Sequence, residues 1–169
     1  MDVCRFPTNR GNSDDVSAVI SMYADMVYRI AYMRTKTPHD ADDVFQNVFL
    51  AYMQSDRNFE TEEHRKAWLI IVTVNSCAKL LSSSWFKKTV PLEDDTLHYE
   101  LPEQYGLLEA IRKLPEKYGT LLYLFYYEQM QISEISKVLD IKEKTIRMQL
   151  TRARRLLKDY LEWEDPADE

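Results

Sequence analysis

Apolar residues recur at three- and four-residue steps along most of the chain, which is the period of an α-helix. One such series runs from Val16 to Ala31 and ends before Thr37-Pro38, where proline favours a break between helices. Further series follow near Asp40 and over about residues 65–81. These patterns predict a first unit of three helices. The apolar face of its second helix comprises Ala41, Phe45, Val48 and Tyr52.

The helical pattern is interrupted between the two halves of the chain. Pro91, Pro102 and the acidic run Glu93-Asp94-Asp95 are typical of a linker. The second half is again helical, and we expect its aromatic stretch, residues 118–127, in the core. The sequence therefore predicts an all-α fold of two small helical domains joined by a flexible linker. The predicted boundaries are an N-terminal tail at 1–13, a first domain at 14–88, an acidic linker at 89–106, a second domain at 107–161 and an acidic tail at 162–169.

Composition limits the compartment and the chemistry. The chain has 169 residues and a formal net charge of -6. It contains no apolar run of membrane-spanning length, and residues 1–12 are polar rather than typical of a signal peptide. Cys4 and Cys77 match no metal-ligand spacing, and the three histidines accompany no nucleophile or metal cluster. We expect a cytoplasmic protein with no cofactor, no metal, no enzymatic activity and no membrane partner.

A helix-turn-helix pattern lies in the second domain. Its supporting helix has an apolar face that ends at Leu139, and Ile141 closes the turn. Asp140 stands where glycine most easily adopts a left-handed conformation, and Lys142 stands where a serine cap is expected. The next helix is amphipathic, with one apolar face directed to the core. That face consists of Ile146, Leu150, Ala153 and Leu157.

The sign of the charge reverses along this last helix. Between Lys142 and Lys158, seven basic residues accompany only one acidic residue, Glu143, which gives a local charge of +6. A solvated amphipathic helix would explain the charge alone, but the preceding helix and turn favour DNA binding, because phosphates require cations where a helix docks. The residues expected nearest to base edges are Lys144, Thr145, Arg147 and Met148. Thr151 lies further along the helix, together with Arg152, Arg155 and Lys158, which are suited to phosphates.

Two further signatures lie in the first domain, at Asp40–Phe49 (DADDVFQNVF) and Trp68–Asn75 (WLIIVTVN). Together with the second domain they make the chain resemble, over about residues 23–161, the bacterial sigma factors of the extracytoplasmic-function group within the sigma-70 superfamily. Gly119 departs from the family pattern, which usually has arginine there. The segments similar to the family's region four are Leu114–Gly119, Glu134–Ile141 and Thr145–Arg154.

The resemblance implies a non-catalytic subunit that binds core RNA polymerase and initiates transcription from promoter DNA. It assigns the minus-thirty-five element to the helix from Glu143. It assigns opening of the minus-ten element to the helix around Trp68 and the loop before it, where unpaired bases are read by stacking and by their edges. Trp68 itself is expected in the core. The implied residues are Asp43, Gln46, Asn47 and Leu50 for core polymerase and Phe59, Arg65, Lys66, Asn75 and Lys79 for the minus-ten element.

The same resemblance implies two contacts on the polymerase, the beta-prime coiled coil and the beta flap, and it adds an anti-sigma factor to the expected partners. Lys79 is the only basic residue between Asn75 and Lys87, so few side chains there can contact phosphates. Promoter affinity without polymerase is therefore expected to be weak. The acidic linker resembles the segment that threads toward the active centre, although a solvated spacer explains its charge equally well.

Two other functions remain compatible with the residues: a two-domain helix-turn-helix regulator that never binds core polymerase, and a helical protein-interaction adaptor. Replacing Asp43 and Gln46 by alanine should abolish polymerase binding by a sigma factor but have no effect on such a regulator. DNA binding through several cations should fall steeply with added salt, whereas the apolar interface of an adaptor should be nearly insensitive to salt.

Overall fold

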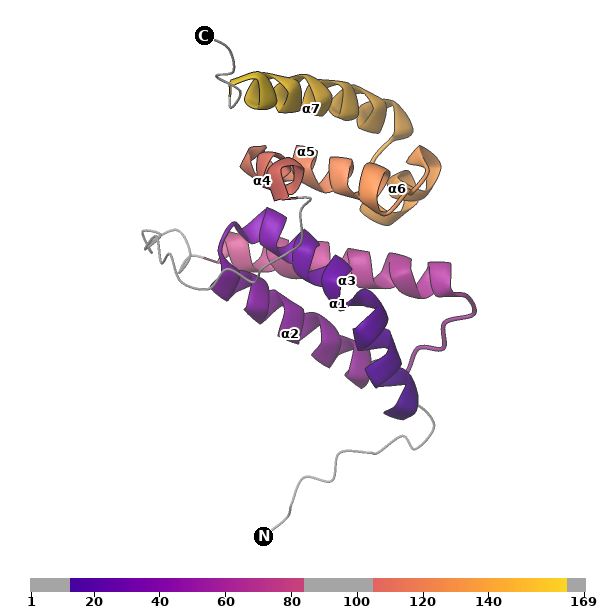
Figure 1. Cartoon of the computed structure of the whole chain (residues 1–169). Coiled ribbons are helices and arrows are strands. Elements are labelled where there is room, and N and C mark those ends of the chain that lie inside the picture. Colours follow the sequence, from indigo (N-terminus) through magenta and orange to yellow (C-terminus); the bar gives the residue numbers. More distant parts are fainter. Residues whose placement is uncertain (1–12, 84–104, 164–169) are drawn as a thin grey trace.

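The computed structural model describes residues 13–83 and 105–163, which form helices and their connections (Figure 1). The all-α class is therefore confirmed. In Figure 1 the helices α4–α6 lie between α7 and the three helices of the first unit. The first unit contains α1 (Ser13–Thr35), α2 (Pro38–Gln54) and α3 (Glu62–Ser82). The second unit contains α4 (Tyr105–Lys113), α5 (Glu116–Leu122), the π-helical turn η2 (Tyr123–Tyr127), α6 (Ile132–Leu139) and α7 (Glu143–Trp163).

Threonine side chains determine where α2 and α3 begin. Thr37 accepts a hydrogen bond from the amide of Asp40 at 3.2 Å, and Pro38 occupies the first turn of α2. Thr61 likewise accepts from the amide of His64 at 3.1 Å at the start of α3. The first amides of a helix have no intrahelical acceptor, so each cap satisfies a donor that would otherwise rely on water.

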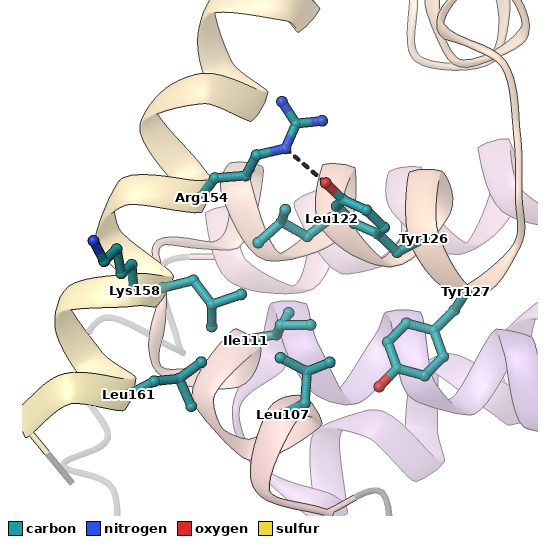
Figure 2. A pocket seen from close by; sticks show the side chains of 9 residues that line it. Leu107, Ile111, Leu122, Tyr126, Tyr127, Arg154, Lys158 and Leu161 are labelled. Atoms are coloured by element: carbon teal, nitrogen blue, oxygen red, sulfur yellow. Dashed lines mark hydrogen bonds between the residues drawn. The ribbon is translucent and has the colours of Figure 1, made fainter. Parts of the chain in front are cut away.

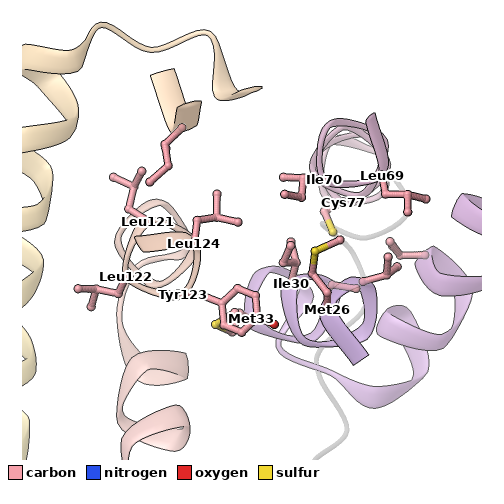
Figure 3. Close-up of a cluster of buried hydrophobic side chains, with 14 of the residues drawn as sticks. Met26, Ile30, Met33, Leu69, Ile70, Cys77, Leu121, Leu122, Tyr123 and Leu124 are labelled. Atoms are coloured by element: carbon pink, nitrogen blue, oxygen red, sulfur yellow. The ribbon is translucent and has the colours of Figure 1, made fainter. Parts of the chain in front are cut away.

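The core of the first unit is built from all three helices. The predicted apolar face of α2 is confirmed, since Ala41, Val48 and Tyr52 are buried and Phe45 packs against the core from the edge. Their partners include Val27, Ile30, Leu69 and Ile70, all of which are fully buried. Figure 3 shows Ile30 on α1 facing Ile70 on α3.

The aromatic stretch at residues 118–127 is divided between core and surface. Tyr118 and Tyr123 are buried as expected, whereas Tyr126 is half exposed. The cause is η2, in which the amide of Glu128 donates to the carbonyl of Tyr123 at 3.2 Å, five residues back. A π-helical turn changes the direction of the side chains within it relative to a regular α-helix, and Tyr126 lies in this turn. The prediction of a wholly buried stretch is therefore correct for Tyr123 and wrong for Tyr126.

Gly119, the departure from the family pattern, allows α5 to approach α4 closely. A Cβ atom at this position would lie 3.0 Å from the backbone oxygen of Ile111. Side chains cannot be accommodated at that distance without movement of the backbone. The glycine therefore has a packing role between two short helices.

The helix ends differ slightly from the predicted boundaries. Ser13 already belongs to α1, α4 begins at Tyr105, and α7 continues to Trp163, each one or two residues beyond the predicted limits. The apolar pattern marks where burial begins, whereas backbone hydrogen bonding continues beyond it. Residues 1–12, 84–104 and 164–169 lie outside the described residues, and they include most of the predicted linker and most of each predicted tail.

The two units pack directly against each other. Helix α1 contacts α4 and α5, and α3 contacts α6. One buried apolar cluster continues across the boundary between the units, with Met26 and Met33 of α1 and Tyr123 and Leu124 of η2 among its members (Figure 3). The flexible link predicted between the domains therefore joins units that are in contact in this structure.

Candidate functional site

Helices α6 and α7 form the predicted helix-turn-helix. Asp140, between them, has φ 54 and ψ 47, which is the left-handed conformation predicted for this position. The hydroxyl of Ser136 donates to the carbonyl of Ile141 at 2.7 Å, and the amide of Gln131 donates to the carboxylate of Glu134 at 2.7 Å. The Ser136 hydroxyl thus helps to hold a turn that contains no glycine, and Glu134 caps the start of α6.

The two faces of α7 divide as the sequence predicts. Ile146, Leu150 and Ala153 are buried, and Leu157 packs against the core from its edge. The candidate DNA-binding residues lie elsewhere on the helix, and all but one are exposed. The exposed residues are Lys144, Arg147, Met148, Thr151, Arg152 and Arg155, whereas Thr145 is half-buried.

Two of these side chains make contacts along the helix. The guanidinium of Arg147 donates to the carboxylate of Glu143 at 3.0 Å, and the hydroxyl of Thr151 donates to the carbonyl of Arg147 at 3.0 Å. Exposed ion pairs of this kind contribute little free energy, so a phosphate or a base edge can replace Glu143. Met148 carries the large apolar side chain of this surface and is 47% exposed.

Arg154 is directed toward η2 instead of toward the recognition surface. Its guanidinium lies 5.6 Å from the ring centres of both Phe125 and Tyr126, and its Nε donates to the hydroxyl of Tyr126 at 2.7 Å (Figure 2). Part of the positive charge of α7 therefore stabilises the second unit.

Beside Arg154 the second unit has an apolar groove between α4, η2 and α7 (Figure 2). Its volume is about 590 Å³. Leu107 and Leu161 are each 42% exposed at its edge. No local sequence pattern predicts this groove, because α4, α5, η2 and α7 all contribute to its walls. The apolar residues that line it include Leu107, Ile111, Leu122, Tyr126, Leu157 and Leu161.

The strip predicted to bind core polymerase lies exposed along α2. Asp43, Gln46, Asn47 and Leu50 are all accessible, and the carboxylate of Asp43 has the ring of His39 at 3.8 Å as its neighbour. Met53, which is 51% exposed about one helical turn beyond Leu50, extends the accessible surface of this strip. Its three-residue spacing from Leu50 places it on the same side of α2.

The candidate minus-ten residues fall into two groups. Phe59 packs among Tyr52, Trp68 and His64, with ring centres 5.9, 5.7 and 5.8 Å away. Arg65 lies over the ring of Phe59 at 5.6 Å and pairs with Glu62. Trp68 is half-buried against the core, in agreement with its expected role.

Lys66 contacts the second unit, which the sequence did not predict. Its ammonium lies 2.7 Å from the carboxylate of Glu128. Asn75 and Lys79 form the second group and are exposed further along α3. The rise along the helix axis from Lys66 to Asn75 is about 14 Å at 1.5 Å per residue. The structure therefore places Phe59, Arg65 and Lys66 near one end of α3 and the remaining two candidates toward the other.

Within residues 13–83 and 105–163, no group of three or more histidine, cysteine, aspartate or glutamate side chains could hold a metal ion. None of the helices described there is long and apolar enough to cross a membrane.

Comparison with known proteins identifies both units. The model of "Sigma-70 region 2" matches residues 19–86, and the model of "Sigma-70, region 4" matches residues 106–157. Together they span most of the chain, in the order that the sequence analysis expected.

Curated relatives and solved structures agree with these matches. The chain is 24% identical to the ECF RNA polymerase sigma factor SigW of Bacillus subtilis, over 90% of this chain and 91% of the relative. It is 26% identical to the RNA polymerase sigma factor SigV of the same organism, over 82% and 86% of the two chains. The fold is similar to that of the sigma factor RpoE from Bartonella quintana, solved in complex with the anti-sigma factor NepR, with a TM-score of 0.69, 17% identity and coverage of 88% and 98%. The chain therefore belongs to the sigma-70 family and is an RNA polymerase sigma factor of the extracytoplasmic-function group.

Proposed function

We propose that this sigma factor directs core RNA polymerase to promoters by reading the minus-thirty-five element with α7 and opening the minus-ten element with α3 and the loop before it. The observation that carries the proposal is the exposed surface of α7. Its cations and Met148 are accessible, while the apolar residues of the same helix are buried. Recognition helices of this design place their N-terminal residues at base edges in the major groove.

On α7 we assign Lys144, Thr145, Arg147 and Met148 to base edges and Thr151, Arg152 and Arg155 to the part of the helix nearer the phosphates. Arg147 is suited to a bidentate contact with guanine once it leaves Glu143. The other cations supply the salt-dependent, sequence-independent part of the affinity.

For the minus-ten element we assign Phe59 and Asn75 to unpaired bases and Arg65, Lys66 and Lys79 to the backbone of the opened strand. Phe59 is half-buried and offers part of an aromatic surface on which a base can stack. Asn75 carries an exposed amide, which can donate to and accept from a base edge.

For core polymerase we assign Asp43, Gln46, Asn47 and Leu50 to the beta-prime coiled coil, and the groove beside Arg154 to the beta flap. The mixed polar and apolar character of the α2 strip suits a helical partner. The groove suits an apolar helix of the partner, since such helices bind by their apolar face. We further propose domains at 14–88 and 107–161, a location in the cytoplasm, an anti-sigma partner and no catalytic role.

Run-off transcription with core polymerase and genomic templates tests this function. Adding the protein should produce specific starts, and replacing Asp43 and Gln46 by alanine should abolish them together with polymerase binding. Exposed residues on α2 tolerate alanine, so the variant should remain folded. Folded wild-type protein that directs no specific start would contradict the assignment. Starts that persist in the double variant would contradict only the α2 strip.

A further inference from the structure

A single carboxylate lies within the basic surface that we assign to the minus-thirty-five element. Glu143 is the first residue of α7 and the only acidic residue between Lys142 and Lys158, where seven residues are basic. Its side chain is 44% exposed. A carboxylate weakens the sequence-independent attraction of such a surface for DNA, because that attraction depends on cations that neutralise phosphates. Glu143 therefore contributes nothing favourable to binding of the phosphate backbone.

The carboxylate of Glu143 is directed along α7 toward the next turn. Its Oε2 accepts a hydrogen bond from Nη2 of Arg147 at 3.0 Å. Glu134, in the first turn of α6, is oriented differently, since its carboxylate accepts from the backbone amide of Gln131 and caps that helix. The two helices thus use a glutamate of the first turn in different ways, and Glu143 has as its partner a side chain that we assign to a base edge.

Binding of DNA by Arg147 leaves Glu143 without this partner. The Arg147 side chain is 60% exposed, and an exposed ion pair is weak, so the O6 and N7 of a guanine can displace the carboxylate. The displaced carboxylate then lies between base edges and phosphates, where fewer water molecules solvate it. A charged acceptor in that position opposes binding unless another donor replaces Arg147.

The major groove offers a donor that suits a carboxylate. Glutamate accepts from the N4 amino group of cytosine, whereas glutamine suits adenine, because an amide pairs with both N6 and N7. Thymine presents only an acceptor and a methyl group. The rise along α7 from Glu143 to Arg147 is about 6 Å at 1.5 Å per residue, which corresponds to one or two base-pair steps of about 3.4 Å. The expected donor is therefore a cytosine close to the guanine.

We propose that Glu143 determines specificity within the minus-thirty-five element by selecting a cytosine, on either strand, one or two base pairs from the guanine bound by Arg147. In the free protein the carboxylate is paired with Arg147. On the matching sequence the guanidinium binds guanine and the carboxylate accepts from cytosine N4, so each group exchanges one partner for another. Where no amino group is within reach, the carboxylate lacks a donor and opposes binding. This inference rests on the proposed function of α7.

Transcription from a promoter library tests this selection. A promoter identified by run-off transcription with the holoenzyme is randomised over its minus-thirty-five element, and each template carries a transcribed barcode that is counted by sequencing. The wild type should prefer guanine at one position and, one or two base pairs away, cytosine over thymine by roughly tenfold. Arg147→Ala should lose the guanine preference, which identifies that position.

The Glu143→Gln variant should change the identity of the preferred base. Glutamine has nearly the same shape as glutamate but pairs with N6 and N7 of adenine, so the preference should move from cytosine to adenine at the same position. Glu143→Ala should lose the cytosine preference without acquiring one for adenine, and it provides an independent measurement if the glutamine variant does not fold. A residue that only stabilises the start of α7 would affect all members of the library equally.

The matched control is Asp159→Asn, which removes the same charge from an exposed position near the far end of the same helix. It should keep every preference of the wild type. Retention of the cytosine preference by Glu143→Gln and Glu143→Ala would overturn the proposal. Loss of that preference in Asp159→Asn would overturn it as well, because the effect would then follow from charge anywhere on α7.

A failure of this inference is distinguishable from a failure of the proposed function. Wild-type holoenzyme that directs no specific start would contradict the sigma activity and remove the role of Glu143 with it. Specific starts without a cytosine preference beside the guanine would remove only the role of Glu143 and leave the sigma activity intact.

Discussion

Met148 presents a large apolar side chain among the cations of α7, and its exposure suggests a specific contact. The residue is 47% exposed in the half of the helix that we assign to the major groove. Thymine is the base with an apolar group in that groove, its 5-methyl. We predict that replacing one thymine of the minus-thirty-five element by uracil, which lacks the methyl group, lowers transcription by the wild type. Met148→Ala should lower transcription from the thymine promoter to a similar degree. The same uracil replacement should then have no further effect on transcription by this variant.

Run-off transcription on a promoter identified with the holoenzyme measures this effect, with each thymine replaced in turn. A contact of this kind is worth about 1 kcal/mol, or roughly fivefold. Tyr160→Ala is the control, since Tyr160 is 38% exposed on the same helix but near its far end. If Met148→Ala leaves the response to every uracil unchanged, Met148 reads no methyl group.

Cys77 gives a second prediction at this scale. The thiol is fully buried among core residues of the first unit, and burial raises its pKa from 9.0 to about 11. The folded protein therefore keeps the thiol protonated at pH 8, where an unfolded chain already contains some thiolate. We expect iodoacetamide to leave the Cys77 peptide unmodified in native protein at pH 8 and to modify it in urea, as measured by mass spectrometry. Equal modification in both conditions would contradict the buried position.

The sequence identifies single residues well where their role depends on near neighbours. The left-handed Asp140 and the exposed candidates on α7 follow from the helix-turn-helix spacing alone. The pairing of Lys66 with Glu128 joins residues far apart in the chain, and no local pattern carries it. The same is true of Arg154, whose partners on η2 become visible only when α7 packs on the second unit.

At the scale of elements, apolar periodicity predicts the long helices of the first unit and leaves their ends uncertain by a few residues. Capping by Thr37 and Thr61 starts α2 and α3 somewhat before the apolar pattern suggests. The turn η2 could not be predicted, because its five-residue hydrogen bonding has no sequence period of its own. Tyr126 and Tyr127 of this turn line the groove, whose other walls come from helices far apart in the sequence.

The contact of α4 with α5 at Gly119 leads to a prediction about stability. A Cβ there would lie 3.0 Å from the backbone oxygen of Ile111, which cannot move away as a side chain would. We expect Gly119→Leu to lower the free energy of unfolding by about 1–3 kcal/mol, the usual cost of overpacking. Urea unfolding followed by circular dichroism measures the change. Lys117→Leu, at an exposed position on the same helix, is the control and should differ little from wild type.

For the whole molecule, the sequence predicts two domains and a linker but not their contact. Periodicity shows which residues form the apolar face of each helix, but not which other elements that face contacts. Met33 and Tyr123 belong to an apolar cluster that spans both units. The charged contacts at the boundary likewise join residues of the first unit to residues of the second. In the sequence, each of these charged residues is indistinguishable from an ordinary surface residue.

Contact across this boundary should make the two units unfold together, and Arg34 is the side chain to change. Its side chain contacts Thr120 and Glu116 and is only 13% exposed, the least of the charged groups that form ion pairs between the units. We expect calorimetry to show one transition for the wild type and two for Arg34→Met combined with Glu128→Gln, because a cooperative transition requires coupling between the units. Methionine preserves the packing of the arginine stem, and Thr120 keeps its hydrogen bond to the carbonyl of Glu116 at 2.8 Å, so each unit should remain folded. Arg57→Met with Asp42→Asn, both exposed and away from the boundary, should preserve the single transition. Two transitions already present in the wild type would mean that the units are not coupled in solution.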